Sequence, residues 1–183
     1  MASERVRSEM PGTARRLLGL LAGTAVVASI AGCAGLGGYS NQALFPDDVA
    51  SVRLEMFDNR SFRRGVEYVL SDALAKRIEV ETPYKIVSSR DRTDSVMSGQ
   101  LVAVGESILT VERDVARPLE KEVTVTAVVN WKNLNTGRIM INNETVIASA
   151  SYSEFQNQDF TYASHLAVNK LAQKIVERME NKW

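Results

Sequence analysis

The sequence predicts an α+β fold, a two-layer sandwich in which two amphipathic helices pack on one face of a mixed four- to five-stranded sheet. Two segments, residues 66–78 and 160–180, have apolar residues at helical spacing, so each needs an apolar surface to cover. The remaining regular segments alternate apolar and polar residues, as half-buried strands do. The order strand, helix, three or four strands, helix leaves one sheet face for both helices.

The first strand is expected at residues 48–57, where Val52, Leu54 and Met56 share one face. The turn-forming residues 58–61 follow it.

The first helix is expected to begin near Gly65 and to end before Pro83. Its apolar stripe consists of Val66, Val69, Leu70, Ala73, Leu74 and Ile78. The stripe of the C-terminal helix consists of Ala167, Val168, Leu171, Ala172, Ile175, Val176 and Met179.

Between the helices, a short strand is expected at residues 84–88, a polar loop at 90–94 and a longer strand at 95–104. Residues 108–112 are expected to extend this strand beyond a kink at Gly105. The residues that share its apolar face are Met97, Leu101 and Ala103.

A charged connection at residues 113–118 leads to the clearest strand, at 122–131. A hairpin turn at 133–137, with Gly137 suited to positive φ, joins it to a return strand at 138–152. The first helix allows a parallel crossover, whereas this hairpin requires an antiparallel pair, so the sheet should be mixed. One face of the clearest strand carries Val123, Val125, Ala127, Val129 and Trp131.

The N-terminal residues have the parts of a bacterial lipoprotein leader in the right order. Four arginines precede an uncharged apolar run at residues 17–30, which suits a signal peptide better than a membrane span of about 20 residues. The run ends in Ile30-Ala31-Gly32-Cys33, which resembles the lipobox of lipoproteins. The alternatives are a transmembrane anchor or a plain secreted protein with an incidental cysteine.

The lipoprotein resemblance implies cleavage before Cys33 and lipid attachment to its thiol, which is nucleophilic as the thiolate. Residues 1–32 are then a removed signal peptide, 33–44 a lipid anchor with a glycine-rich tether, and 45–183 a single α+β domain. Because Ala34 replaces the aspartate that commonly retains lipoproteins at the inner membrane, the domain is expected to face the periplasm from the outer membrane.

Composition argues against several classes of function. The 183-residue chain has a net charge of zero, which disfavours nucleic-acid binding. One cysteine excludes an intramolecular disulfide and a cysteine-based zinc site, and the lone His165 lacks a partner at metal-ligand spacing. Asp91 and Asp94 alternate with arginines and suggest a solvated loop rather than paired catalytic carboxylates. No catalytic residue, metal or cofactor is therefore expected.

Three stretches of the mature chain together resemble the LptE family of lipopolysaccharide-assembly lipoproteins. They are "MFDNRSFRRGVEYVLSDAL" at residues 56–74, "TDSVMSGQLV" at 93–102 and "VTVTAVVNWKNLNTGRIM" at 123–140. The resemblance implies two helices on a four-stranded sheet and a function without catalysis. It further implies that the protein plugs the lumen of an LptD-type outer-membrane β-barrel, assists its folding and binds lipopolysaccharide.

None of the matching motifs is a binding motif, so no family binding residue can be transferred. The loop-borne candidates for lipid phosphates are Arg90, Arg92, Arg113 and Arg117, although the sequence favours ordinary solvated loop charges over binding residues at these positions. Two alternative functions remain open. One is a periplasmic activator or secretion lipoprotein with an LpoB- or CsgG-like domain, which should have another helix near residues 90–117. The other is a lipid-anchored enzyme.

Overall fold

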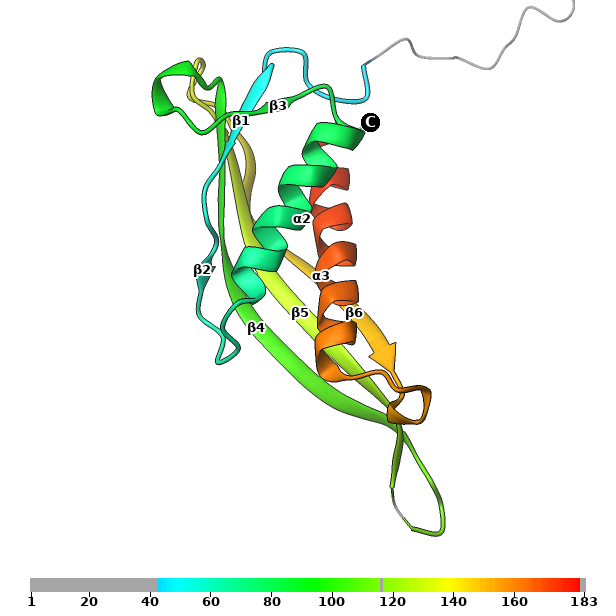
Figure 1. Cartoon of the computed structure of the whole chain (residues 1–183). Coiled ribbons are helices and arrows are strands. Elements are labelled where there is room, and N and C mark those ends of the chain that lie inside the picture. Colours follow the sequence, from blue (N-terminus) through cyan, green and yellow to red (C-terminus); the bar gives the residue numbers. More distant parts are fainter. Residues whose placement is uncertain (1–42, 116, 182–183) are drawn as a thin grey trace, which may run out of the picture. The chain divides into compact units, whose positions relative to one another are not determined.

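The computed structural model describes residues 43–115 and 117–181, in which two helices lie against a long, twisted sheet (Figure 1). The predicted signal peptide, Cys33 and most of the tether lie outside the described residues. In chain order the elements are β1 (Ser51–Leu54), β2 (Asp58–Asn59), α2 (Val66–Glu81), β3 (Lys85–Ile86), η2 (Arg90–Arg92), β4 (Ser95–Val111), β5 (Pro118–Asn133), β6 (Ile139–Tyr152), η3 (Glu154–Gln156) and α3 (Phe160–Glu177).

The sheet is mixed, with strand order β3-β1-β4-β5-β6. β1 is parallel to both β3 and β4, whereas β4, β5 and β6 pair antiparallel through two hairpins. The sixth strand, β2, is the two-residue segment predicted as a turn, and it pairs parallel with β4 beyond the end of β1. The turn chemistry is also present, because the Asn59 side chain accepts hydrogen bonds from both the amide and the hydroxyl of Ser61.

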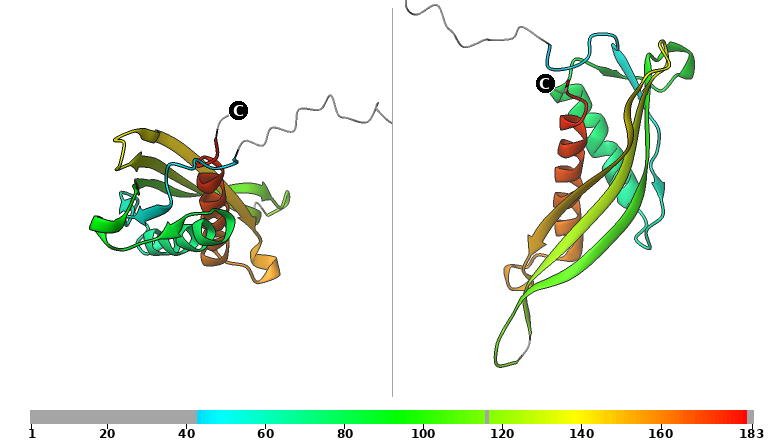
Figure 2. Two further views of the ribbon diagram at one scale, coloured as in Figure 1. Left: turned by 90° about the horizontal axis from the view of Figure 1, so that it is seen from above. Right: turned by 180° about the vertical axis from the view of Figure 1, so that it is seen from behind.

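Both helices lie on the same face of the sheet (Figure 2), which confirms the predicted two-layer α+β sandwich. α3 packs against β5, β6 and α2. Among the described residues, no helix covers the opposite sheet face, and none is long and apolar enough to span a bilayer.

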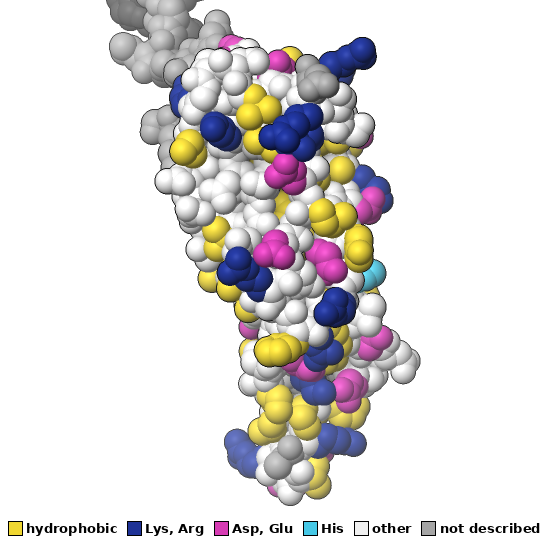
Figure 3. All heavy atoms as spheres, turned by 90° about the vertical axis from the view of Figure 1, so that its left-hand side faces the viewer, with side chains coloured by type: hydrophobic (Ala, Val, Ile, Leu, Met, Phe, Trp, Pro, Cys, Tyr) yellow, Lys and Arg dark blue, Asp and Glu magenta, His cyan; other side chains and the backbone are white. Residues whose placement is uncertain are grey.

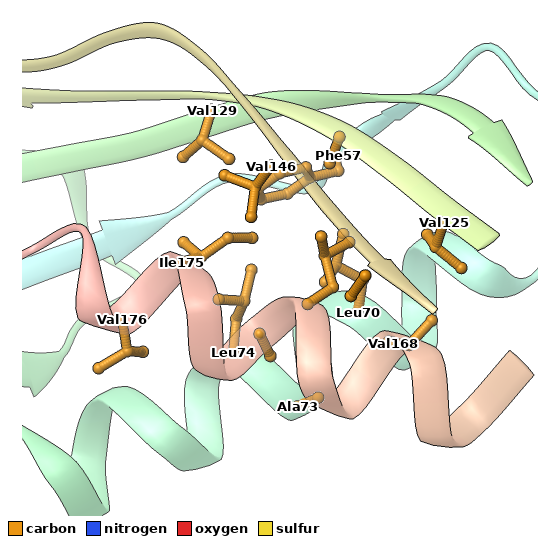
Figure 4. Packing of buried hydrophobic residues seen from close by; sticks show 14 of the residues in the cluster. Phe57, Leu70, Ala73, Leu74, Val125, Val129, Val146, Val168, Ile175 and Val176 are labelled. Carbon is orange, nitrogen blue, oxygen red and sulfur yellow. The ribbon is translucent and has the colours of Figure 1, made fainter. Parts of the chain in front are cut away.

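The core forms between the helices and the covered face of the sheet (Figure 4). The stripe predicted on β5 is entirely buried, from Val123 to Trp131 at the hairpin end. The stripes predicted on the two helices are buried as well, apart from Val69, which is half-buried. The Trp131 indole donates a hydrogen bond to Ser95 Oγ at 3.0 Å, so its one polar group is satisfied inside the core.

Two face assignments and one kink were predicted wrongly. Met56 is exposed because β1 ends at Leu54, and its sulfur accepts a hydrogen bond from Ser71 on α2. Ala103 is exposed because a register shift between Leu101 and Ala103 interrupts the alternation of faces. β4 is not kinked at Gly105, since its irregularities lie at Val102 and around Leu109.

Among the described residues, glycine occupies two of the positions with positive φ. Gly65 precedes α2 with φ of 93°, and Gly137 has φ of 75° in the β5–β6 hairpin. α3 is instead capped by Asp159, whose carboxylate accepts a hydrogen bond from the amide of Tyr162 at 2.8 Å.

Asp94 is not the solvated loop residue that the sequence suggested. Its carboxylate accepts hydrogen bonds from the amides of Ala50 and Ser51, from the Ser51 hydroxyl and from the Asn135 amide group, at 2.8 to 3.1 Å. These bonds lower the pKa of Asp94, with that from Asn135 contributing most. Asp94 therefore ties the start of β1 to the β5–β6 turn.

Candidate functional site

The β4–β5 hairpin extends past the helices that cover the rest of the sheet (Figure 1). The 17 residues of β4 span about 55 Å at strand geometry. The 18 residues of α3 span only about 27 Å at helix geometry. β6 ends at Tyr152, which pairs with Lys121, and past this point β4 and β5 pair only with each other. The tip is therefore a two-stranded ribbon.

Exposed apolar side chains gather at the hairpin tip. Ile108 is 56% and Val115 64% exposed, and Phe155 of the neighbouring η3 turn is also exposed. Figure 3 shows yellow and dark-blue side chains close together at this narrow end. Such concentrations on a protruding element mark contact surfaces. We call them the tip cluster, which comprises Ile108, Leu109, Val111, Val115, Leu119 and Phe155.

Two of the predicted arginines, Arg113 and Arg117, lie beside the tip cluster. The Arg117 guanidinium lies 4.5 Å from the centroid of the Phe155 ring and 2.9 Å from the Glu112 carboxylate. The Glu112 amide also donates to the Arg117 carbonyl at 2.8 Å, which closes the loop. Arg113 is exposed and forms no ion pair with any described residue. The tip therefore combines apolar surface with accessible guanidinium groups.

A polar cluster holds the hairpin at its base. Lys121 Nζ lies 2.6 Å from Glu154 and 3.8 Å from Glu106, and the Tyr152 hydroxyl donates to Glu106. The hydrogen bond to Glu154 raises the pKa of Lys121, and burial raises that of Tyr152. The cluster links β4, β5, β6 and η3.

The other predicted arginines, Arg90 and Arg92, are exposed on the η2 turn at the opposite end of the domain (Figure 1). The structure therefore brings the four candidates together as two separate pairs. Only the pair at the hairpin adjoins the tip cluster.

The described residues contain no group of three or more His, Cys, Asp or Glu side chains that could bind a metal ion. His165 is exposed on α3 and lines a groove between the two helices. The lysine, arginine, aspartate and glutamate side chains that line that groove form ion pairs with each other, as in the 2.7 Å contact between Lys76 and Asp72. This groove offers no nucleophile with an oriented base.

The sequence pattern does not predict the tip cluster. It predicts residues 108–112 only as a strand extension, and Phe155 belongs to no apolar stripe. The available signal was length, because a continuous 17-residue strand is too long for helices of 16 and 18 residues to cover.

Comparison with solved structures shows the same fold in two bacterial proteins. The hypothetical protein CT253 from Chlamydia trachomatis is 10% identical with a TM-score of 0.51, over 71% of this chain and 95% of that one. The uncharacterized lipoprotein B from Nitrosomonas europaea is 11% identical with a TM-score of 0.52, over 73% and 82%.

Sequence comparisons give one significant assignment. No curated protein matches the chain significantly. The family model of LptE, described as lipopolysaccharide-assembly, matches residues 49–182, which include every strand and helix of the domain. The chain therefore belongs to the LptE family.

Proposed function

We propose that this protein is an outer-membrane lipoprotein, anchored through Cys33, that acts as a non-catalytic assembly and plug partner of an LptD-type β-barrel. In this role it would help to transport lipopolysaccharide and insert it into the outer leaflet. The observation that carries the proposal is the LptE match across residues 49–182. The lipobox-like ending at Cys33 supports the anchor.

Within this function, the hairpin tip is proposed to contact lipopolysaccharide. Aliphatic side chains of the tip cluster would contact acyl chains, which gains the free energy of apolar burial. Arg113 and Arg117 would donate hydrogen bonds to lipid A phosphates, for which the planar guanidinium is well shaped. Arg90 and Arg92 lie at the opposite end of the domain from the tip cluster, and they are proposed to be solvated charges.

The LpoB- or CsgG-like alternative is less well supported. It requires another helix near residues 90–117. The described residues of that stretch contain only the three-residue η2 turn, the strand β4 and the hairpin loop.

The barrel partnership is tested by isolating the full lipoprotein from outer membranes of its own organism in mild detergent. We expect a large LptD-type β-barrel to copurify, and depletion of the lipoprotein to reduce lipopolysaccharide at the cell surface. Recovery of a free monomer, together with normal surface lipopolysaccharide after depletion, would refute the proposal.

Lipid anchoring is tested separately by mass spectrometry of the mature N-terminus. We expect an acylated Cys33 as the first residue. A Cys33→Ala variant should accumulate as an uncleaved precursor, and finding the same N-terminus in both proteins would contradict the assignment.

A further inference from the structure

The two long edges of the sheet differ in how they are protected. β6 pairs with β5 on one side only, and α3 shields its other side. Lys174 donates to the carbonyl of Ile147 at 2.8 Å, and Lys170 donates to that of Ser149 at 3.2 Å. These lysines occupy backbone acceptors that an additional strand would use, so this edge is blocked.

On the other side of the sheet, the edge of β4 that faces away from β5 has no such protection. β1 and β2 pair with β4 only as far as Leu101, and no described strand continues along it. Residues 103–108 pair regularly with β5 between the irregularities at Val102 and Leu109. Because backbone groups alternate between the two sides of a strand, about half of those in this stretch point away from β5. We call residues 103–108 the open edge.

The side chains of the open edge favour an uncharged segment with aliphatic residues. The stretch "AVGESI" contains no proline, lysine or arginine, which are common protectors of edges. Its one charged residue, Glu106, already accepts from Tyr152 and lies 3.8 Å from Lys121. Val102 and Leu109, at the two ends, are 43% and 48% exposed.

We propose that the open edge binds an extended, uncharged aliphatic segment of the β-barrel partner by strand addition. This inference rests on the proposed function, because the barrel supplies the segment. A second copy of this chain is a poorer occupant, since six residues are far fewer than the roughly 20–30 per side of a stable interface. A partner that surrounds the domain would supply the remaining contacts elsewhere.

Strand addition is tested by placing a photo-crosslinking amino acid at each position from 103 to 108 in turn, in the full lipoprotein coexpressed with the LptD-type barrel. Mass spectrometry then identifies the linked barrel residue. We expect the linked residue to move steadily along one extended segment as the probe moves along β4, because paired strands keep a fixed register. Links to scattered barrel sites, links to a second copy, or none in a complex that still forms would each overturn strand addition and leave the proposed function intact. Failure to recover any complex would refute both.

A matched pair of variants measures the contribution of the edge. Ser107 on β4 and Ser151 on β6 are both exposed and both pair with Glu122, from opposite sides. Ser107→Lys places a charge at the open edge, so we expect it to weaken barrel binding about tenfold. Ser151→Lys makes the same charge change beside the same glutamate at the blocked edge and should bind like the wild type. Equal binding by both variants, with unchanged thermal unfolding, would overturn the proposal.

Discussion

The strands β4 and β5 run through both the helix-covered body and the projecting hairpin. Apolar side chains facing the helices are buried in the body, whereas those of the tip cluster are exposed. Along β5, the residues from Val123 to Trp131 that face the helices are buried. From the Ile108–Lys121 pair to the hairpin loop, no described helix covers the two strands (Figure 1), and Ile108 and Val115 are exposed. Strand pairing alone therefore does not bury side chains. The body buries its apolar side chains in a core, whereas the hairpin leaves them exposed.

The largest difference between the two regions should appear on truncating one buried and one exposed side chain. Trp131 is 1% exposed, and its indole donates a hydrogen bond to Ser95. The centroid of its ring lies 5.6 Å from that of the Tyr84 ring. Trp131→Ala should lower the free energy of unfolding by about 3–5 kcal/mol. Val115→Ala in the tip cluster should change it by less than about 0.5 kcal/mol. Chemical denaturation measures both unfolding free energies. Similar losses in the two variants would contradict the difference between the buried body and the exposed hairpin.

Two glycines of β4 allow the same comparison with one added methyl group. A Cβ at Gly99 would lie 2.4 Å from both Phe57 Cε1 and the Val128 carbonyl oxygen, whereas one at Gly105 would meet nothing within 4 Å. Gly99→Ala should therefore destabilise the domain by about 1–3 kcal/mol. Gly105→Ala should be neutral or slightly stabilising, because it restricts the unfolded chain. Thermal unfolding of the two variants tests this difference. A destabilising Gly105→Ala would show that an added methyl group meets neighbouring atoms in the hairpin.

Asp94 gives the body a dependence on pH. The pKa of Asp94 is lowered in the folded state by hydrogen bonds, chiefly from Asn135 and Ser51. The unfolded chain therefore takes up the proton first as the pH falls. The stability that the carboxylate contributes is present above its unfolded pKa of about 4 and is lost as the pH falls through the lower folded value. Asp94→Asn should cost about 1 kcal/mol at neutral pH.

Denaturation of wild type and Asp94→Asn between pH 6 and pH 2.5 checks this expectation. The difference in unfolding free energy should shrink toward the acid end of the range. A difference independent of pH would mean that the carboxylate charge is not what stabilises the body.

The smallest effect on stability is expected for a polar double substitution in the tip cluster. Leu109→Ser combined with Val115→Ser removes two exposed aliphatic side chains, and the unfolding transition should move by less than about 1 °C. Calorimetry measures the transition. Binding of the variant to lipopolysaccharide micelles should nevertheless weaken, since apolar contact area is lost.

Sequence periodicity predicted the body well because each of its long elements buries a single face, whose residues recur at regular spacing. The stripe on β5 and both helical stripes follow the spacing of a single buried face. The regular alternation fails at Val102, because one unpaired residue exchanges the faces of the residues that follow. No residue type in the sequence indicates this register shift. The role of Asp94 depends on Asn135, which is 41 positions away in the chain, so local turn chemistry could not reveal it.

The candidate site was only half predictable for a similar reason. Arg113 and Arg117 could be named because charged loops are visible in the sequence. The tip cluster could not, because exposure of Ile108 depends on where α3 begins relative to β4 in space. Phe155 lies beside the hairpin through a contact between residues distant in sequence, in which its ring packs under the Arg117 guanidinium.

The central claim is that the hairpin, and not the opposite end of the domain, binds lipopolysaccharide. It is tested most directly by the dissociation constant for lipopolysaccharide of three proteins: wild type, Arg113→Glu with Arg117→Glu, and Arg90→Glu with Arg92→Glu. Both variants change the net charge by the same amount, so nonspecific electrostatic attraction affects them alike. We predict that the hairpin variant binds at least about tenfold more weakly and that the η2 variant binds like wild type. Equal loss in both variants, or loss in the η2 variant alone, would contradict the account.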